Sequence, residues 1–238
     1  QDNNLPKALV KINSKILLFH SMMNYINHDF YNFILPIGFY KESFISFFKN
    51  KKKIYNKKCK IFFNHKEYLK FENSKHKVIK ILLINTGKKY NKAERIVKVL
   101  KKLKLNEFAL SYGDGVGNVN LTKLYMMHLK SPHIMSVASM KPKSQYGHFV
   151  FNEKNNQAID FIEKPSITEW VNIGYFFLKK EAIKYLKKYQ NQDLEIGVMK
   201  NIVRKNKLLV YKHTGFWKSV DTLKDSIELS KIIKNVKK

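Results

Sequence analysis

The chain has 238 residues, of which 44% are hydrophobic and 13% aromatic. This content is typical of a globular protein and excludes a disordered one. The length suits one domain spanning residues 1–238. The single cysteine, Cys59, excludes an internal disulfide framework and indicates a reducing cytoplasm. Because the sequence has no run of 18 uncharged apolar residues, we predict no membrane span.

The net charge is +28, from 46 basic and 18 acidic residues. A charge of this size is typical of nucleic-acid-binding proteins. The lysines are spread along the whole chain, however, and do not form one basic stripe. The joint abundance of Lys, Asn, Ile and Tyr indicates a compositionally biased genome. We therefore expect no nucleic-acid partner and favour an anionic small substrate.

Helices and strands are predicted to alternate along the chain. Helical spacing of apolar residues predicts helices at 16–25, 41–48, 93–105, 121–129, 181–189, 195–205 and 221–233. Short apolar runs predict strands at 33–37, 60–63, 78–84, 108–110, 134–138, 158–162, 170–178 and 208–212. The lysine-rich run 49–60 is expected to be a solvated loop. This alternation favours an α/β sheet with parallel pairs at its centre.

The stretch 107–120 has the pattern of a buried strand that stops at a glycine-flanked aspartate, Asp114. A carboxylate at the carboxyl end of a strand lies where open α/β sheets bind their ligands. The flanking Gly113 and Gly115 would let phosphates approach the backbone. Gly-Asp-Gly is also the pattern of an ordinary turn, so this motif alone does not decide between the two interpretations.

Three further pieces have both an ordinary and a functional interpretation. Glu163 and Lys164 precede a proline after a predicted strand, and form either a surface ion pair or a sugar and phosphate contact. Asp221 follows the aromatic pair of Gly-Phe-Trp, and is either a helix N-cap or a second metal ligand. Lys7 follows a proline and suits a triphosphate, although it is one lysine among many.

Together and in this order, these pieces resemble a known family. The resemblance is to the sugar-1-phosphate nucleotidylyltransferases, and within them to the glucose-1-phosphate cytidylyltransferases. It covers nearly the whole chain, and its most specific parts are YGDGV and the GFW and DTL triplets. The motifs that carry it are PKALVKI (6–12), YGDGV (112–116), EKP (163–165), WVNIGYFFL (170–178) and HTGFWKSVDTLKD (213–225).

The resemblance implies a Rossmann-like α/β fold of the nucleotide-diphospho-sugar transferase type, with a mixed, mostly parallel sheet flanked by helices. It implies Mg²⁺-dependent transfer of a cytidylyl group from CTP to a sugar 1-phosphate, expected to be glucose 1-phosphate. The products would be a CDP-sugar and pyrophosphate, for surface polysaccharide biosynthesis in the cytoplasm. Use of another NTP and a catalytically inert sugar-nucleotide-binding homologue remain alternatives, and a homo-oligomer is left open.

The resemblance also assigns roles to individual residues. Lys7, Asp114 and Asp221 would be catalytic, with both aspartates holding Mg²⁺ and Lys7 neutralising the triphosphate. The nucleotide would lie against Lys7, Tyr90, Arg95 and Gly113. The sugar phosphate would be bound by Glu163, Lys164 and Asn172.

Two departures from the family pattern affect these expectations. The family's first strand and the glycine-rich loop that cradles the triphosphate should precede Pro6, and the sequence contains neither. Either residues ahead of Gln1 carry them, or the triphosphate is held in another way. In addition, Ala93 and Glu94 replace paired glycines before Arg95, which places a carboxylate near the expected nucleotide and puts base selectivity in question.

Overall fold

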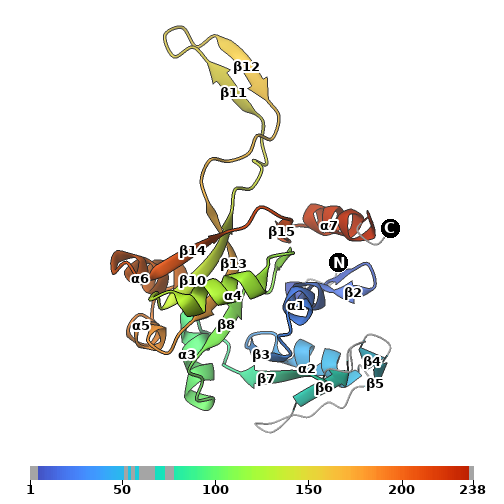
Figure 1. The fold of residues 1–238 in the computed structure, drawn as a ribbon. Coiled ribbons are helices and arrows are strands. Elements are labelled where there is room, and N and C mark those ends of the chain that lie inside the picture. Colours follow the sequence, from blue (N-terminus) through green and yellow to red (C-terminus); the bar gives the residue numbers. More distant parts are fainter. Residues whose placement is uncertain (1–4, 51–52, 55–56, 59–67, 73–77, 236–238) are drawn as a thin grey trace.

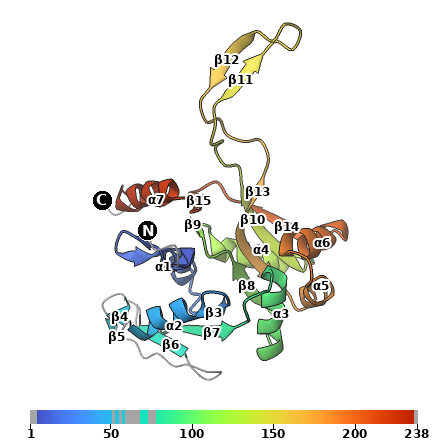
Figure 2. The same ribbon diagram turned by 180° about the vertical axis from the view of Figure 1, so that it is seen from behind.

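The computed structural model describes residues 5–50, 53–54, 57–58, 68–72 and 78–235. Two sheets dominate these residues (Figures 1 and 2). The larger has the strand order β14 (Leu208–Lys212), β10 (Met135–Met140), β13 (Val171–Leu178) and β8 (Phe108–Ser111). The smaller has the order β3 (Asn32–Ile37), β7 (Val78–Asn85) and β6 (Tyr68–Glu72).

β13 is one of the two inner strands of the larger sheet, and both of its faces are covered. Ile173, Tyr175 and Phe177 pack with α1 (Leu17–Asn27) and α4 (Leu121–Lys130). Phe176 and Leu178 point the other way, toward α3 (Lys92–Lys102) and α5 (Ala182–Lys188). Burial on both faces explains the continuous apolar run of this strand. Each such side chain contributes about 1.5–3 kcal/mol.

Two helices contact both sheets. On one face, α1 packs Leu18 and Met22 against Ile79 and Ile81 of β7, while its Tyr25 packs against the larger sheet. On the other face, α3 packs against the larger sheet and also against Leu82 and Ile84 of β7. α2 (Lys41–Asn50) completes the cover of β7. The helices α1 and α3, which contact both sheets, therefore fix the position of the smaller sheet relative to the larger one.

Gly174 marks an irregularity in β13. Its φ is +81°, a conformation that favours glycine, and a Cβ there would lie 2.6 Å from the Tyr112 ring. The pairing of β10 with β13 shifts register between Val137 and Ser139, close to this point. The bulge and the missing side chain together make room for Tyr112 beside the strand.

The α/β class is confirmed, with a mixed sheet and flanking helices. Within the two larger sheets, β10 pairs with β14 and β3 with β7 in parallel, while the other described pairs are antiparallel. Antiparallel pairing is therefore more frequent than the sequence predicted. No helix within the described ranges is long and apolar enough to cross a membrane.

Most predicted elements are present, with three differences. The helix expected at 195–205 begins as a π-helical turn, η2 (Leu194–Met199), and continues as α6 (Lys200–Arg204). The loop expected at 49–60 contains a short antiparallel pair, β4 (Lys53–Ile54) with β5 (Lys57–Lys58). The strand predicted at 60–63 lies outside the described residues.

The third difference is an arm that stands away from both sheets (Figures 1 and 2). The predicted strand at 158–162 forms β12 (Ala158–Ile162), which pairs with β11 (His148–Phe151) and not with a central sheet. Residues 148–164 are all exposed. The rings of Phe149 and Phe161 lie 4.9 Å apart and give the pair its main side-chain contact. The sequence pattern of β12 did not distinguish a sheet strand from an arm.

We expect His128 to make the stability of the fold depend on pH. Its ring is fully buried between α4 and β10, where Nδ1 lies 2.7 Å from Oγ of Ser136. Burial, and then the charge of Lys179, lowers the pKa of His128 from 6.5 to about 4. Between these two pH values His128 binds a proton in the unfolded chain but not in the folded one. The free energy of unfolding is therefore highest above pH 6.5 and decreases as the pH falls toward 4.

This effect lowers the free energy of unfolding by about 2 kcal/mol between pH 7 and pH 5. Urea denaturation at both pH values measures it, and His128→Gln should remove that part of the difference. His148→Gln, at an exposed position on β11, is the control for replacing a histidine by glutamine. An unaltered pH dependence in His128→Gln would contradict this explanation.

Candidate active site

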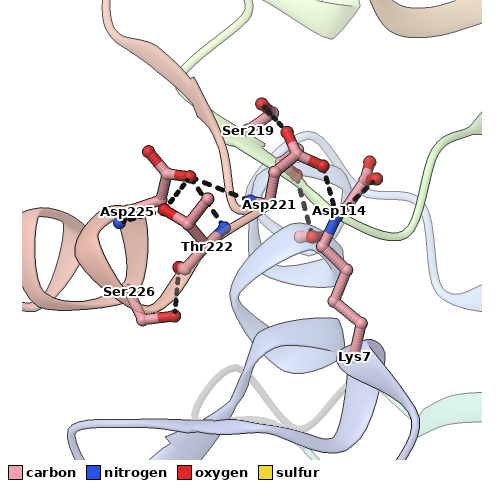
Figure 3. A network of polar contacts seen from close by, with 9 residues as sticks. Lys7, Asp114, Ser219, Asp221, Thr222, Asp225 and Ser226 are labelled. Carbon is pink, nitrogen blue, oxygen red and sulfur yellow. Dashed lines mark hydrogen bonds and ion pairs between the residues drawn. The ribbon is translucent and has the colours of Figure 1, made fainter.

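Lys7 is the first charged side chain of the site and lies at the start of the short helix η1 (Lys7–Leu9). Pro6 precedes it with a φ of −61°, and Leu9 is buried against α1 and β7. These two neighbours fix the backbone, so the long side chain extends from a rigid base. Its Nζ lies 2.6 Å from Oδ1 of Asp221 and 3.3 Å from Oδ2 of Asp114 (Figure 3).

Asp114 lies in the turn between β8 and β9 (Gly115–Gly117). β9 pairs in antiparallel with β15 (Trp217–Ser219), and the backbone of Val220 donates to the Asp114 carbonyl at 3.0 Å. The hydroxyl of Ser21 on α1 also donates to the Gly115 carbonyl at 2.8 Å. These contacts place Asp114 next to Asp221, although 107 positions separate them in the sequence.

Asp221 precedes α7 (Leu223–Asn235) but does not cap it. Thr222 is the cap: its hydroxyl accepts from the Asp225 backbone at 3.2 Å, and the Asp225 carboxylate accepts from the Thr222 backbone at 2.9 Å. That carboxylate also accepts from the Asp221 backbone at 3.1 Å (Figure 3). The Asp221 side chain is therefore free of the capping role and faces Lys7. The sequence interpretation of Asp221 as part of the N-cap is corrected in this respect.

The three charges change one another's proton affinity. Burial lowers the pKa of Lys7, but the hydrogen bond with Asp221 and the charge of Asp114 outweigh it, so the pKa is raised. The hydrogen bond from Lys7, followed by that from Ser219, lowers the pKa of Asp221. Lys7 is thus a cation and Asp221 an anion at neutral pH. Because the Asp221 side chain is 62% exposed, this ion pair contributes at most about 1 kcal/mol to stability.

The cluster fits a divalent cation in its chemistry. Two carboxylates reach one ammonium, which leaves one uncompensated negative charge if all three are ionised. Carboxylate oxygens are the hard ligands that Mg²⁺ takes, commonly one or two from the protein with the remainder from water and substrate phosphates. Within the described ranges, no group of three or more His, Cys, Asp or Glu side chains could hold a metal. The candidate metal ligands from this part of the chain are therefore Asp114 and Asp221.

A second polar cluster surrounds Tyr112, two residues before Asp114. The Tyr112 hydroxyl donates to Glu195 and accepts from Nδ2 of Asn172 at 3.2 Å. Lys92 completes the cluster, with Nζ 2.5 Å from Glu195. Burial, and then the contact with Glu195, raises the pKa of Tyr112 well above its ordinary value. Tyr112 therefore stays protonated and positions Asn172 near the Gly113–Asp114 turn.

Arg95 lies on α3 and binds the loop that follows β7. Its guanidinium donates to Oγ1 of Thr86 at 2.7 Å and to the carbonyls of Gly87 and Tyr90 at 3.1 and 3.0 Å. Tyr90 is partly exposed, and its ring centroid lies 3.3 Å from Nζ of Lys98. Arg95, from α3, thus fixes the conformation of the loop that carries Tyr90.

Glu94, the carboxylate that raised the question of base selectivity, has a structural role. Its Oε2 accepts from the backbone of Asn91 at 2.9 Å, and Oδ1 of Asn91 accepts from the backbone of Glu94 at 2.9 Å. This reciprocal pair is a capping box at the start of α3. The Glu94 carboxylate is therefore bound to a helix terminus.

The structure separates Glu163 and Lys164 from the Lys7 cluster. Both follow β12 at the base of the exposed arm and form an ion pair with each other at 3.5 Å. Within the part of the chain that the structure describes, neither has a hydrogen bond or ion pair to Lys7, Asp114 or Asp221. Gly113, by contrast, is exposed beside Asp114, and a Cβ there would meet nothing within 4 Å.

Four residues that shape the site had no predicted role: Asp225, Ser219, Tyr112 and Glu195. The Thr222–Asp225 spacing has the pattern of a capping box, and this signal could have identified Asp225. Tyr112 belongs to the YGDGV motif, but its contact with Glu195 joins residues far apart in the sequence, so this role could not be predicted for either residue. Ser219 acts locally, two residues before Asp221, and no motif signals this contact. Ser219 donates to Oδ2 of Asp221 at 2.7 Å, which orients that carboxylate.

The sequence matches the family model described as nucleotidyl transferase over residues 3–236. The chain belongs to the nucleotidyl transferase family. It is similar to a protein of Bacillus subtilis (strain 168) named probable glucose-1-phosphate cytidylyltransferase, with 29% identity over 97% of this chain and 89% of the relative. It is also similar to the glucose-1-phosphate cytidylyltransferase of Salmonella typhimurium, with 24% identity over 94% of this chain and 86% of the relative.

Solved structures share the fold at low identity. HddC from Yersinia pseudotuberculosis has a TM-score of 0.65 and 16% identity, over 98% of this chain and 92% of that one. A UDP-glucose pyrophosphorylase complexed with UDP-glucose has a TM-score of 0.64 and 14% identity, over 97% and 90%. The predicted Rossmann-like fold and the prediction of a sugar-1-phosphate nucleotidylyltransferase enzyme are confirmed.

The Asp225 carboxylate should contribute more to stability than its neighbour Asp221. Asp225 accepts hydrogen bonds from Thr222 and Lys218 and is 20% exposed, so Asp225→Ala removes a helix cap and leaves Lys218 with one partner fewer. We expect a loss of about 1–3 kcal/mol in the free energy of unfolding. Asp221→Ala should cost less than about 1 kcal/mol, because its ion pair is exposed. Urea denaturation of both variants measures the difference, and equal losses would contradict this assignment.

Proposed function

We propose that the chain transfers a cytidylyl group from CTP to glucose 1-phosphate, and that residues 1–238 act as one nucleotidylyltransferase domain. The phosphate oxygen of the sugar phosphate attacks the α-phosphorus of CTP, and pyrophosphate leaves. The products are CDP-glucose and pyrophosphate, the former as a precursor for surface polysaccharide. The observation that carries this proposal is the convergence of Lys7, Asp114 and Asp221 in a member of the nucleotidyl transferase family.

In this reaction, Lys7, Asp114 and Asp221 would act by compensating the charge of the phosphates. Phosphoryl and nucleotidyl transfer require positioning and stabilisation of negative charge more than covalent participation by the protein. Lys7 supplies one positive charge that is maintained at neutral pH, because its pKa is raised. Asp114 and Asp221 would hold Mg²⁺ between them. When bound, Mg²⁺ supplies charge stabilisation to phosphate oxygens.

The remaining residues would position the two substrates. Gly113 leaves open space beside Asp114 that a phosphate or ribose can approach. The loop that Arg95 holds, with Tyr90 on its surface, would meet the nucleotide. Asn172, held by Tyr112, would contact the sugar. Glu163 and Lys164 would bind the sugar phosphate from the base of the arm.

Two alternatives follow from the same site. Another NTP could replace CTP, since charge compensation does not select a base. A catalytically inert homologue could bind the sugar nucleotide with the same residues. The capping role of Glu94 explains one of the two departures from the family pattern by a structural function, and so favours the enzyme over the inert homologue.

The test follows pyrophosphate release from CTP and glucose 1-phosphate in the presence of Mg²⁺. We expect Asp114→Asn and Asp221→Asn each to lower the rate by at least about 100-fold, since each removes one candidate ligand. Glu181→Gln, at an exposed carboxylate near α5, is the matched control and should retain full activity. Each of the four common NTPs is assayed in parallel to test the base.

Full activity in Asp114→Asn would contradict the role of the carboxylate pair. Absence of release with every NTP and sugar-phosphate pair would contradict the enzyme assignment. Calorimetric titration with CDP-glucose then tests the inert homologue, which requires binding without turnover.

A second prediction concerns the base of the arm. If Lys164 binds the sugar phosphate, Lys164→Met should raise the KM for glucose 1-phosphate by about ten- to a hundredfold, with the KM for CTP nearly unchanged. Steady-state kinetics with each substrate varied in turn measures both constants. Lys154→Met, in the exposed turn between β11 and β12, is the control. An equal change in both KM values would indicate a general effect of the arm and would contradict the assignment.

A further inference from the structure

The polar cluster around Tyr112 connects α3 to β13 beside the candidate active site. Its members are Lys92 at the start of α3, Glu195 on η2, Tyr112 just after β8, and Asn172 on β13. Lys92 and the Tyr112 hydroxyl both donate to Oε1 of Glu195. Nδ2 of Asn172 in turn donates to the Tyr112 hydroxyl at 3.2 Å. The cluster therefore joins a pair of charged residues to the proposed sugar contact.

The direction of each hydrogen bond in the cluster is fixed. The backbone N–H of Gly174 can only donate, and it lies 2.9 Å from Oδ1 of Asn172, so the amide oxygen must face it. The Asn172 nitrogen then faces Tyr112, whose hydroxyl oxygen accepts. The proton of Tyr112 is left for Glu195, since an ionised carboxylate can only accept. Each group thus has a single orientation.

Glu195 is ionised at neutral pH, as this arrangement requires. Burial alone would raise the pKa of Glu195, but hydrogen bonds from Lys92 and Tyr112 outweigh burial, so the pKa is lowered. Nζ of Lys92 also lies 5.2 Å from the centroid of the Tyr112 ring, within the range of a cation–π contact. Lys92 therefore holds both the carboxylate and the aromatic ring next to it.

The backbone that carries the cluster is held at both ends. Asn91, the N-cap of α3, donates from Nδ2 to the Gln190 carbonyl at 2.9 Å, which joins the start of α3 to the segment before η2. Glu195 lies on η2, and π-helical turns are rare and occur frequently at functional sites. At the other end, the absence of a Cβ at Gly174 leaves room for the Tyr112 ring.

Asn172 retains one hydrogen-bond donor for a ligand. Its Nδ2 carries two hydrogens. Among the residues that the structure describes, Tyr112 is the acceptor for this nitrogen, which leaves the second hydrogen to a ligand. An amide rotated by 180° would instead direct its nitrogen at the Gly174 N–H, which cannot accept. The orientation set by Tyr112 and Gly174 therefore decides that Asn172 offers a donor.

We propose that Tyr112 and Glu195, the latter held by Lys92, are positioning residues for sugar recognition. They orient the Asn172 amide so that its remaining N–H donates to one hydroxyl oxygen of the sugar. This inference rests on the proposed contact between Asn172 and the sugar. A sugar that lacks this hydroxyl leaves the N–H unpaired, and a site built to hydrogen-bond a hydroxyl discriminates against such an analogue.

Calorimetric titration tests the proposal without turnover. CDP-, UDP-, GDP- and ADP-glucose are compared, and the one that the wild-type chain binds most tightly is used with its nucleoside diphosphate. The ratio of the two dissociation constants measures the contribution of the sugar. We expect Tyr112→Phe and Glu195→Leu each to weaken this contribution by about three- to tenfold, since each removes one hydrogen bond. Affinity for the nucleoside diphosphate should change by less than about twofold.

Two further variants separate orientation from packing. Glu195→Gln keeps an oxygen that accepts from Tyr112, so we expect it to recover the ratio to within about twofold of the wild-type value. Tyr185→Phe removes a hydroxyl from another partly buried tyrosine that packs against the same core cluster as Tyr112. This control should leave the ratio unchanged.

Analogues of the sugar nucleotide that lack single sugar hydroxyls identify the group that Asn172 contacts. At least one monodeoxy analogue should bind the wild-type chain about tenfold more weakly, and Tyr112→Phe should reduce that difference. An unchanged ratio in Tyr112→Phe and Glu195→Leu, no recovery in Glu195→Gln, or equal binding of every monodeoxy analogue would overturn the proposal. Pyrophosphate release is measured separately, so absent turnover with intact sugar discrimination would contradict the proposed enzyme and support the positioning role.

Discussion

The pairing of β9 with β15 is the contact on which the candidate active site depends. Gly115, Val116 and Gly117 face Ser219, Lys218 and Trp217 in antiparallel register. This short pair joins the end of β8 to the segment before α7, and so brings Asp114 and Asp221 to one ammonium. Since two-stranded pairs are marginally stable alone, the hydrogen bond from Ser21 and the cap at Thr222 and Asp225 add necessary support.

The Lys7 cluster has more acidic than basic side chains, whereas the chain as a whole has a large excess of basic ones. The protein carries a net charge of +28, whereas the Lys7 cluster contains two carboxylates and one ammonium. A surrounding excess of positive charge attracts phosphate-bearing substrates toward the surface. In the proposed function, the two carboxylates would provide a local position for a cation among these positive charges. General attraction and local cation binding would then be supplied by different residues.

The helices α1 and α3 have a role that extends beyond covering a sheet. Each packs on both the larger and the smaller sheet, and residues of both helices line a mainly apolar cavity of about 620 Å³ beside β3 and β8. α1 also contributes Ser21 to the turn that carries Asp114. Gly113, beside Asp114, is among the residues that line this cavity. The cavity and the candidate active site are therefore adjacent.

The sequence by itself determined the helices and strands with strong periodicity, the α/β class, and the family through motifs around Lys7, Asp114 and Asp221. These features are local, because periodicity and motif spacing are carried by neighbouring residues. It could not determine that β12 lies in an arm or that Tyr112 meets Glu195. Only the tertiary structure decided these two features. The physical reason is that pairing partners, side-chain contacts and cavities depend on residues far apart in the chain, to which local patterns are insensitive.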